Sequence, residues 1–135
     1  LLVQNTNYAA ALQRGRVAAA KQTTAVGAIL ALLTPVVECN RIQIDNGRTY
    51  LREMVFGDPA EPHHAKALAI VGQTEAAIVD ILAQQTGLDP TEAATLARVV
   101  SAILFLTMAS SEHLDSGVER ILAIVRAQIA AILPH

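Results

Sequence analysis

The sequence predicts an all-α protein of one domain, with about six helices in an antiparallel helical bundle. A length of 135 residues suits one domain with one core. Hydrophobic residues make up 53% of the chain but aromatic residues only 3%, and alanine supplies much of the excess. This composition is typical of close-packed helices, whereas strands favour β-branched and aromatic residues. Helix breakers are few, and they separate segments with helical spacing.

Three helices are expected in the first half of the chain. The first covers residues 3–20, with Gly15 as a weak point inside it. The second covers 23–42, where Pro35 lacks an N–H and should either kink the helix or end its first half. The third is short, covers 46–57 and closes at Gly57.

Two further helix starts share the pattern Asp-Pro-x-Glu, at 58–61 and at 89–92. An Asp can accept hydrogen bonds from the free N–H groups of a first turn, Pro is tolerated at the first helical position, and Glu can reach back to the cap. The pattern therefore predicts a fourth helix from the first motif to about Thr86, stopped by Gly87, and a fifth over 90–110. A polar hinge at 110–117 precedes a sixth helix over 116–133, which Pro134 ends.

The fifth helix carries an uncharged run between Arg98 and Glu112. A bilayer-spanning helix needs about 20 largely apolar residues, so this shorter run, which includes Ser101 and Thr107, predicts no membrane span. Its apolar residues occupy two faces, where a helix buried on one side has a single stripe. One face holds Leu96, Val99, Val100, Ile103 and Leu106, and the other Ala94, Ala97, Ser101, Phe105 and Met108.

The sixth helix also has two apolar surfaces. Val118, Ile121, Leu122, Val125, Ile129 and Ile132 form one, and the small residues Ala123, Ala127, Ala130 and Ala131 form the other. Small side chains allow helix axes to approach closely. We therefore expect the last two long helices to form a four-helix interface in a two-fold homodimer. The alternative, a central fifth helix wrapped by the others, explains the fifth helix but leaves the sixth unexplained.

The long capped helices over 61–110, joined by "GLDPTEA" and followed by the amphipathic segment 114–133, resemble the C-terminal regulatory domain of the tetracycline-repressor (TetR) family. The resemblance covers essentially the whole chain. It implies an effector-sensing and dimerisation domain of a one-component transcriptional repressor, whose last two helices form the dimer bundle. Because the chain begins with Leu where the connecting helix of that family would start, the N-terminal helix-turn-helix domain is expected to be absent. Operator DNA would then be bound only through that domain.

The resemblance also implies an effector cavity enclosed by the first five helices. Large side chains, which are rare in this chain, lie on those helices, and we expect them to contact a mostly hydrophobic small molecule with one or two polar groups. Ordinary core packing is the alternative explanation for each of them. The candidate ligand-binding residues are Tyr8, Tyr50, Met54, Phe56, Phe105 and Met108.

Catalytic and metal chemistry find little support in the sequence. Glu61 and His64 form one Glu-x-x-H, whereas carboxylate-bridged di-iron bundles need two such motifs with further Glu residues, so we expect a solvated first turn and no cofactor. Cys39 is the only cysteine; it is expected to be a small buried hydrophobe in a protein of a reducing, cytoplasmic compartment. No nucleophile elbow or phosphate loop occurs, so enzyme activity is not expected.

The charge of the chain bears on nucleic-acid binding. The net charge of −2 argues against DNA binding by this segment alone, since phosphate binding needs a basic face. Arg14, Arg16 and Lys21 form a small basic cluster, which would either lie near DNA in an intact regulator or be a solvated face. Two functional classes remain: the effector-sensing dimeric domain, and a stand-alone helical dimeric interaction module without a small-molecule ligand.

Overall fold

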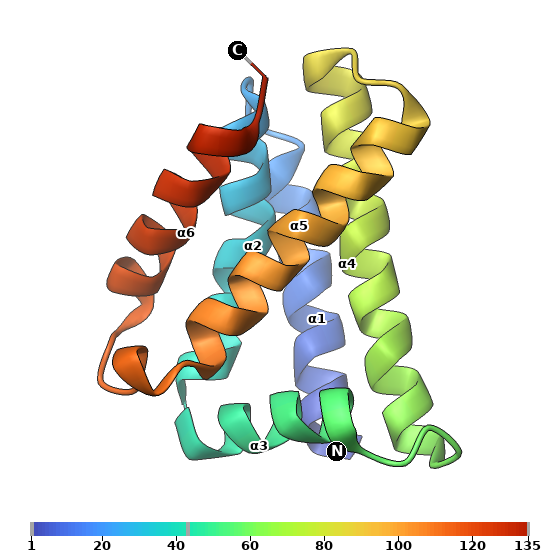
Figure 1. Cartoon of the computed structure of the whole chain (residues 1–135), viewed down its shortest axis with the longest axis vertical. Coiled ribbons are helices and arrows are strands. Elements are labelled where there is room, and N and C mark those ends of the chain that lie inside the picture. The colour runs from blue at the N-terminus through green and yellow to red at the C-terminus, as the bar shows by residue number, and fades with distance from the viewer. Residues whose placement is uncertain (1, 43, 135) are drawn as a thin grey trace.

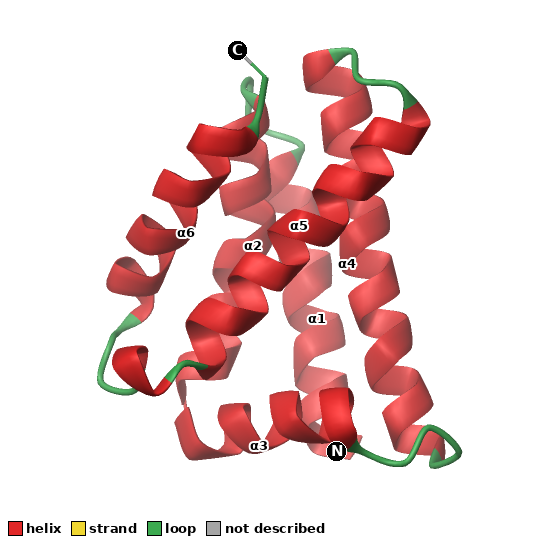
Figure 2. Ribbon diagram, in the orientation of Figure 1, coloured by secondary structure: helices red, strands yellow, loops and turns green. Residues whose placement is uncertain are grey.

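A computed structural model describes residues 2–42 and 44–134 of the chain. Within these ranges the protein forms six α-helices, one short 3-10 turn and no strand, which confirms the predicted all-α fold (Figure 2). The helices are α1 (Leu2–Ala19), α2 (Ala25–Ile42), α3 (Ile44–Phe56), α4 (Pro62–Thr86), α5 (Pro90–Ala109) and α6 (Val118–Ile132), with the 3-10 turn η1 (Ser111–His113) before α6.

The helices form two layers closed at one end (Figure 1). The antiparallel pair α1 and α2 lies at the back, and α5 and α6 lie in front of it, while α4 runs along the side of α1 and α5. Helix α3 lies across the bottom of the bundle and packs on α2, α4 and α5. Helix α6 packs on α2 and α5, so that the core lies between the two layers.

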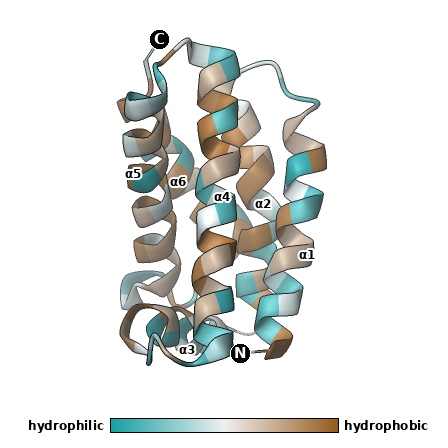
Figure 3. Cartoon of the chain, turned by 90° about the vertical axis from the view of Figure 1, so that its right-hand side faces the viewer, coloured by the Kyte–Doolittle hydropathy of each residue, from teal (hydrophilic) through white to brown (hydrophobic). Residues whose placement is uncertain are grey.

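Each long helix buries one stripe. On α4 the buried residues recur at helical spacing, from His64 through Ile70 and Ile78 to Leu82. Hydrophobic and hydrophilic residues accordingly alternate along α4 and α1 in the side view of Figure 3. Helix α2 is continuous past Pro35, so the alternative that this proline ends the helix is wrong. We attribute its tolerance to the packing of α1, α4 and α6 around α2.

The two Asp-Pro-x-Glu motifs behave differently. Asp89 caps α5 as predicted, with its side chain accepting a hydrogen bond from the backbone N–H of Glu92 at 2.9 Å and Pro90 at the first position. The prediction that Asp58 caps α4 is wrong. Glu61 is the N-cap, with φ −76° and ψ 129°, and it accepts bonds from the backbone N–H groups of both following histidines. A residue that precedes a proline avoids the helical region, so Pro62 delays the start of α4.

The two-face description of α5 also needs correction. Its buried residues come from both predicted faces: Val100 from one and Ala97, Ser101 and Met108 from the other. Among its exposed residues, Thr95, Val99, Ala102 and Leu106 form an uncharged stripe, and the exposed Arg98 lies at the edge of this stripe. On α6 the prediction holds better, because Ile121, Val125 and Ile129 are buried whereas Ala123, Ala127 and Ala131 are exposed. The outer surfaces of both helices are therefore partly apolar.

Helices α1 and α2 form the most extensive helix pair of the bundle. At their crossing Gly15 lies directly against the backbone of Leu32, so that a Cβ at position 15 would overlap the Leu32 carbonyl oxygen. Gly15 is buried, although a glycine inside a helix costs about 1 kcal/mol relative to alanine. Its presence is explained by the close approach of the two backbones.

We expect Gly15→Ala to lower the free energy of unfolding by more than 1 kcal/mol, because α1 must move away from Leu32 and leave voids in the core. Gly72→Ala is the matched control: it also lies inside a helix, but its Cβ would meet no atom within 4 Å. This control should stabilise the chain by about 0.5–1 kcal/mol. Urea unfolding of both variants checks the pair, and equal effects of the two substitutions would contradict the interpretation.

Candidate functional site

Five of the six predicted ligand-binding residues meet at one interior position between α1, α2, α3, α4 and α5. They surround a cavity of about 30 Å³, which has room for little more than a water molecule. Ligand pockets usually measure about 300–1,000 Å³, so this cavity admits a larger ligand only if side chains move. The converging residues are Tyr8, Tyr50, Met54, Phe105 and Met108.

Phe56 does not belong to this group, and its predicted place in the cavity is wrong. It is the last residue of α3, and 83% of its surface is exposed. The helix places Met54 and Tyr50 on its inner side, four residues apart. Phe56 is two residues after Met54, about half a turn around the helix, and so faces outward. Phe56 instead borders a surface hollow of about 280 Å³ together with Arg52 and Phe105.

The centre of the site is a stacked tyrosine pair within a buried polar network. The rings of Tyr8 and Tyr50 lie 4.6 Å apart between centroids, at 24° between planes. The Tyr50 hydroxyl donates to Asn5 Oδ1 at 2.7 Å, and Asn40 Nδ2 donates to the Tyr8 hydroxyl at 3.1 Å. Asn5 Nδ2 in turn donates to the carbonyl of His63 at 2.9 Å. The network thus ties α1 to α2, α3 and the start of α4.

One atom of this network lacks a partner. Asn40 is only 1% exposed, and its Oδ1 accepts no hydrogen bond from the described residues. Exchanging the amide oxygen and nitrogen would satisfy Oδ1 through Tyr8 and leave Nδ2 alone instead. An unpaired buried polar atom costs about 1–3 kcal/mol. In either orientation, the side chain of Asn40 could therefore form one more hydrogen bond next to Tyr8, and that bond would remove this cost.

Burial keeps both hydroxyls protonated to a more alkaline pH than that of a free tyrosine, whose pKa is about 10. It raises the pKa of Tyr8 from 10.0 to about 12, against a smaller lowering by the hydrogen bond from Asn40. Burial also raises the pKa of Tyr50, and the neighbouring Tyr8 raises it further. Both tyrosines are neutral hydrogen-bonding groups near neutral pH, as free tyrosines are, and they remain neutral further into alkali.

The Glu-x-x-H motif shows no sign of metal binding. Glu61 uses both carboxylate oxygens to cap α4, and the hydrogen bond from the His63 N–H is the main reason why the pKa of Glu61 is lowered. The expectation of a solvated first turn holds for His63, which is exposed, but is wrong for His64, which is buried with Nδ1 unpartnered. Among the described residues, no group of three or more potential ligands could hold a metal ion.

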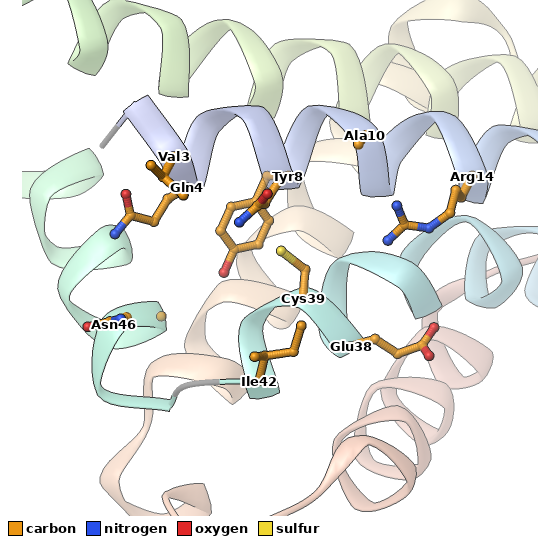
Figure 4. A pocket seen from close by; sticks show the side chains of 11 residues that line it. Val3, Gln4, Tyr8, Ala10, Arg14, Glu38, Cys39, Ile42 and Asn46 are labelled. Carbon is orange, nitrogen blue, oxygen red and sulfur yellow. The ribbon is translucent and has the colours of Figure 1, made fainter.

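An open groove of about 620 Å³ lies next to the tyrosine pair (Figure 4). One face of α1 forms its first wall, and the last turn of α2 with the first turn of α3 forms the second. Tyr8 lines both this groove and the interior cavity, so its side chain is the partition between them. The groove is lined by Val3, Gln4, Asn7, Tyr8, Ala10, Arg14, Glu38, Cys39, Ile42, Asn46 and Gly47.

Cys39 lies in the middle of this groove and is half-buried, not fully buried as expected. Burial raises the pKa of its thiol, against a smaller lowering by the nearby Arg14 guanidinium. A thiol with a raised pKa is a poor nucleophile at neutral pH. Cys39 therefore contributes a neutral, weakly polar surface to the groove.

Arg14 belongs to the basic cluster that the sequence indicated, and it alone of that cluster lines the groove. Arg16 instead donates from Nη2 to the backbone carbonyl of Gln73 at 3.2 Å, and Lys21 lies exposed just beyond α1. All three side chains are exposed, which fits both the solvated face and a position near DNA in an intact regulator.

Comparisons with known proteins identify no relative: no family model, curated protein or solved structure matches the chain.

The two asparagines of the site were not predicted from the sequence. Asn5 and Asn40 were not predicted to be buried, because asparagine is mostly exposed in proteins. A signal was present for Asn5, which lies three residues before Tyr8 on the stripe that continues through Leu12 and Gly15. Asn40 similarly follows Val36 and Val37 at core spacing. The groove itself had no signal, because its shape depends on how α3 meets α1 and α2.

The tyrosine pair predicts a loss of stability in alkali. Ionisation of the Tyr8 hydroxyl is suppressed in the folded chain. Its contribution to the free energy of unfolding is therefore complete below pH 10 and is lost as pH rises toward about 12. Its full size, at 1.36 kcal/mol per pKa unit, is on the order of 2–3 kcal/mol. Tyrosinate absorbance should follow unfolding by circular dichroism, and Tyr8→Phe should weaken the decline. Tyrosinate forming at pH 10 in a chain that stays folded would contradict this.

Proposed function

We propose that this chain is the effector-sensing and dimerisation domain of a one-component transcriptional repressor similar to the tetracycline-repressor family. The observation that carries the proposal is the outer surface of α5 and α6. Its centre is an uncharged stripe on α5, where Leu106 is 73% exposed, beside the exposed alanines of α6. Both helices lie on the same front side of the bundle (Figure 1).

This surface suits a second copy of the chain. Exposed apolar patches of this kind mark interaction surfaces, and the two helices would meet their symmetry mates as a four-helix bundle around a two-fold axis. Ala123 and Ala127 would allow close approach of the helix axes at the centre. Charged residues lie beside the apolar stripes, with Arg98 near Glu75 of α4 at one edge. A polar rim around an apolar centre is typical of such interfaces.

Three helices, α2, α4 and α5, are long and apolar enough to cross a membrane by length and composition alone. Our proposal places them in a soluble, cytoplasmic domain. Arg98, near the middle of α5, has 83% of its side chain exposed, and a charge at the bilayer centre costs about 2.5–3.5 kcal/mol even on the lowest scale. The high hydropathy of α5 is explained equally well if the helix is buried on one side by the core and on the other by a partner chain.

Effector sensing would use the site around Tyr8 and Tyr50. A mostly hydrophobic small molecule with one or two polar groups matches its aliphatic surroundings and its neutral hydroxyl and amide groups. Because the network joins α1, α2, α3 and α4, a ligand that moves it would change their relative positions. Coupling to a distant DNA-binding domain requires that the ligand bind one arrangement of the helices more tightly than the other.

A stand-alone helical interaction module is the second candidate. It is favoured by the small size of the interior cavity, about 30 Å³, since a packed core needs no ligand. The gene sequence on the upstream side of the codon for residue 1 distinguishes the two candidates. A helix-turn-helix domain encoded there favours the regulator, and its absence favours the module.

We expect the chain to be a dimer at micromolar concentration by light scattering. Ala127→Glu should convert it to a folded monomer, because an unpaired charge buried in the interface costs several kcal/mol. Ala83→Glu is the matched control: it introduces the same charge on an exposed position of α4 and should leave the dimer intact. A monomeric unmodified chain would refute the dimer.

A panel of apolar compounds carrying one or two polar groups should raise the melting temperature of the chain. A ligand that binds only the folded state stabilises it by about 2.7 kcal/mol at a hundredfold excess over Kd. For a ligand in the interior cavity, Phe105→Ala should reduce the shift, since Phe105 borders that cavity, whereas the surface substitution Val17→Ala should not. If no compound shifts the melting temperature, the interaction module becomes the better explanation.

A further inference from the structure

We propose that the groove between α1, α2 and α3 binds an uncharged, mostly apolar small molecule through a hydrogen-bond acceptor, and that the Tyr8 hydroxyl donates to it. The inference rests on the proposed sensing function, and it places the ligand outside the interior cavity, on the open side of Tyr8. The groove, at about 620 Å³, lies within the usual range of ligand pockets, whereas the cavity behind Tyr8 does not.

The Tyr8 hydroxyl is the polar group that points to a ligand. With the Asn40 amide as oriented in the structure, the hydroxyl accepts a hydrogen bond from Asn40 Nδ2, and no described residue accepts a bond from its own proton. With the amide oxygen and nitrogen exchanged, the hydroxyl would donate to Oδ1, and Nδ2 would be the unused donor of the pair. Figure 4 shows the hydroxyl directed into the space bounded by Cys39, Ile42 and Asn46. Tyr8 is buried apart from this side, and the pair that it forms with Asn40 holds one further unpartnered amide atom. Buried polar groups are normally satisfied, so a donor left unused at the wall of a groove suggests a missing acceptor.

The charges of the groove favour an uncharged ligand. Arg14 and Glu38 both line it, one from α1 and one from α2, and they form no ion pair with each other. Their formal charges cancel, one positive against one negative, so a net charge on the ligand would be attracted by one side chain and repelled by the other. The remaining walls are amides, a protonated thiol and apolar groups. Such walls suit an apolar body with a carbonyl-like acceptor.

The other surface hollows fit less well. The two beside α3 and α5, of about 280 and 440 Å³, share Met54, Val55 and Phe105. Neither has a counterpart of the Tyr8–Asn40 pair at its wall, and nothing about them indicates one kind of occupant over another. The groove at Tyr8 is distinguished by the Tyr8–Asn40 pair, which has one donor without an acceptor in either orientation of the Asn40 amide.

The fluorescent naphthalene ketone prodan is a suitable probe, because it is neutral and its emission moves to longer wavelength when its carbonyl accepts a hydrogen bond. We expect the folded full chain to bind it. Tyr8→Phe should weaken binding about fivefold, the usual worth of one hydrogen bond, and should shift the bound emission to shorter wavelength. Phenylnaphthylamine, a neutral probe without a carbonyl, should bind the wild type and Tyr8→Phe equally.

A groove-filling variant locates the site. Ala10 is exposed on α1 and lines the groove, so Ala10→Trp should lower the affinity for both probes at least tenfold. Ala83→Trp is the matched control, because Ala83 is exposed on α4 and lines none of the hollows. Circular dichroism of both variants verifies that they fold.

Three results would overturn the proposal: no binding of prodan, unchanged binding in Ala10→Trp, or unchanged affinity and emission in Tyr8→Phe. The proposed sensing function fails separately. If compounds from the panel still raise the melting temperature of Ala10→Trp, sensing stands and the ligand occupies the interior position. If no compound raises it in the unmodified chain, the sensing function itself is lost.

Discussion

The close approach of α1 to α2, where Gly15 lies against the Leu32 backbone, is the constraint on which the rest of the structure depends. It fixes the distance between the two helices and so brings the Tyr8 hydroxyl to 3.1 Å from Asn40 on α2. With that pair in place, α3 can close the end of the bundle through Tyr50, and α4 can begin against Asn5. The groove is the space that remains between α1 and the junction of α2 with α3.

The sequence predicted the helices well because their breakers act locally. Gly87, with φ 72°, ends α4, and Asp89 with Pro90 begins α5, since a left-handed residue and a side-chain cap need no distant partner. The same motif at Asp58 misled because a second proline, Pro62, follows and moves the start by three residues. The start of α4 thus depends on Pro62, a residue that lies just outside the Asp-Pro-x-Glu motif.

The candidate site was predictable only in part. Large side chains are rare in this chain, and their rarity was enough to identify those that meet in the core. Aromatic side chains bury a large area each, so the few that are present tend to fill the core. Rarity could not tell Met54 from Phe56, two residues apart on α3, because the orientation of that helix depends on its tertiary contacts. On α5 the residues that face the core and those that face outward were mixed in the prediction, as both are apolar. Hydrophobicity alone cannot distinguish a core face from a surface awaiting a partner.

The order of the α1–α2 pair in the chain has a consequence for how the protein folds. The two helices are consecutive and joined by residues 20–24, so their contacts close a short loop and cost little chain entropy. We expect this hairpin to form early, with α6 docking later because it packs on α2 from the far end of the sequence. Mutations at the Gly15 crossing would then slow folding, while mutations in α6 would chiefly speed unfolding. Chevron analysis that finds the reverse partition would place the folding nucleus elsewhere.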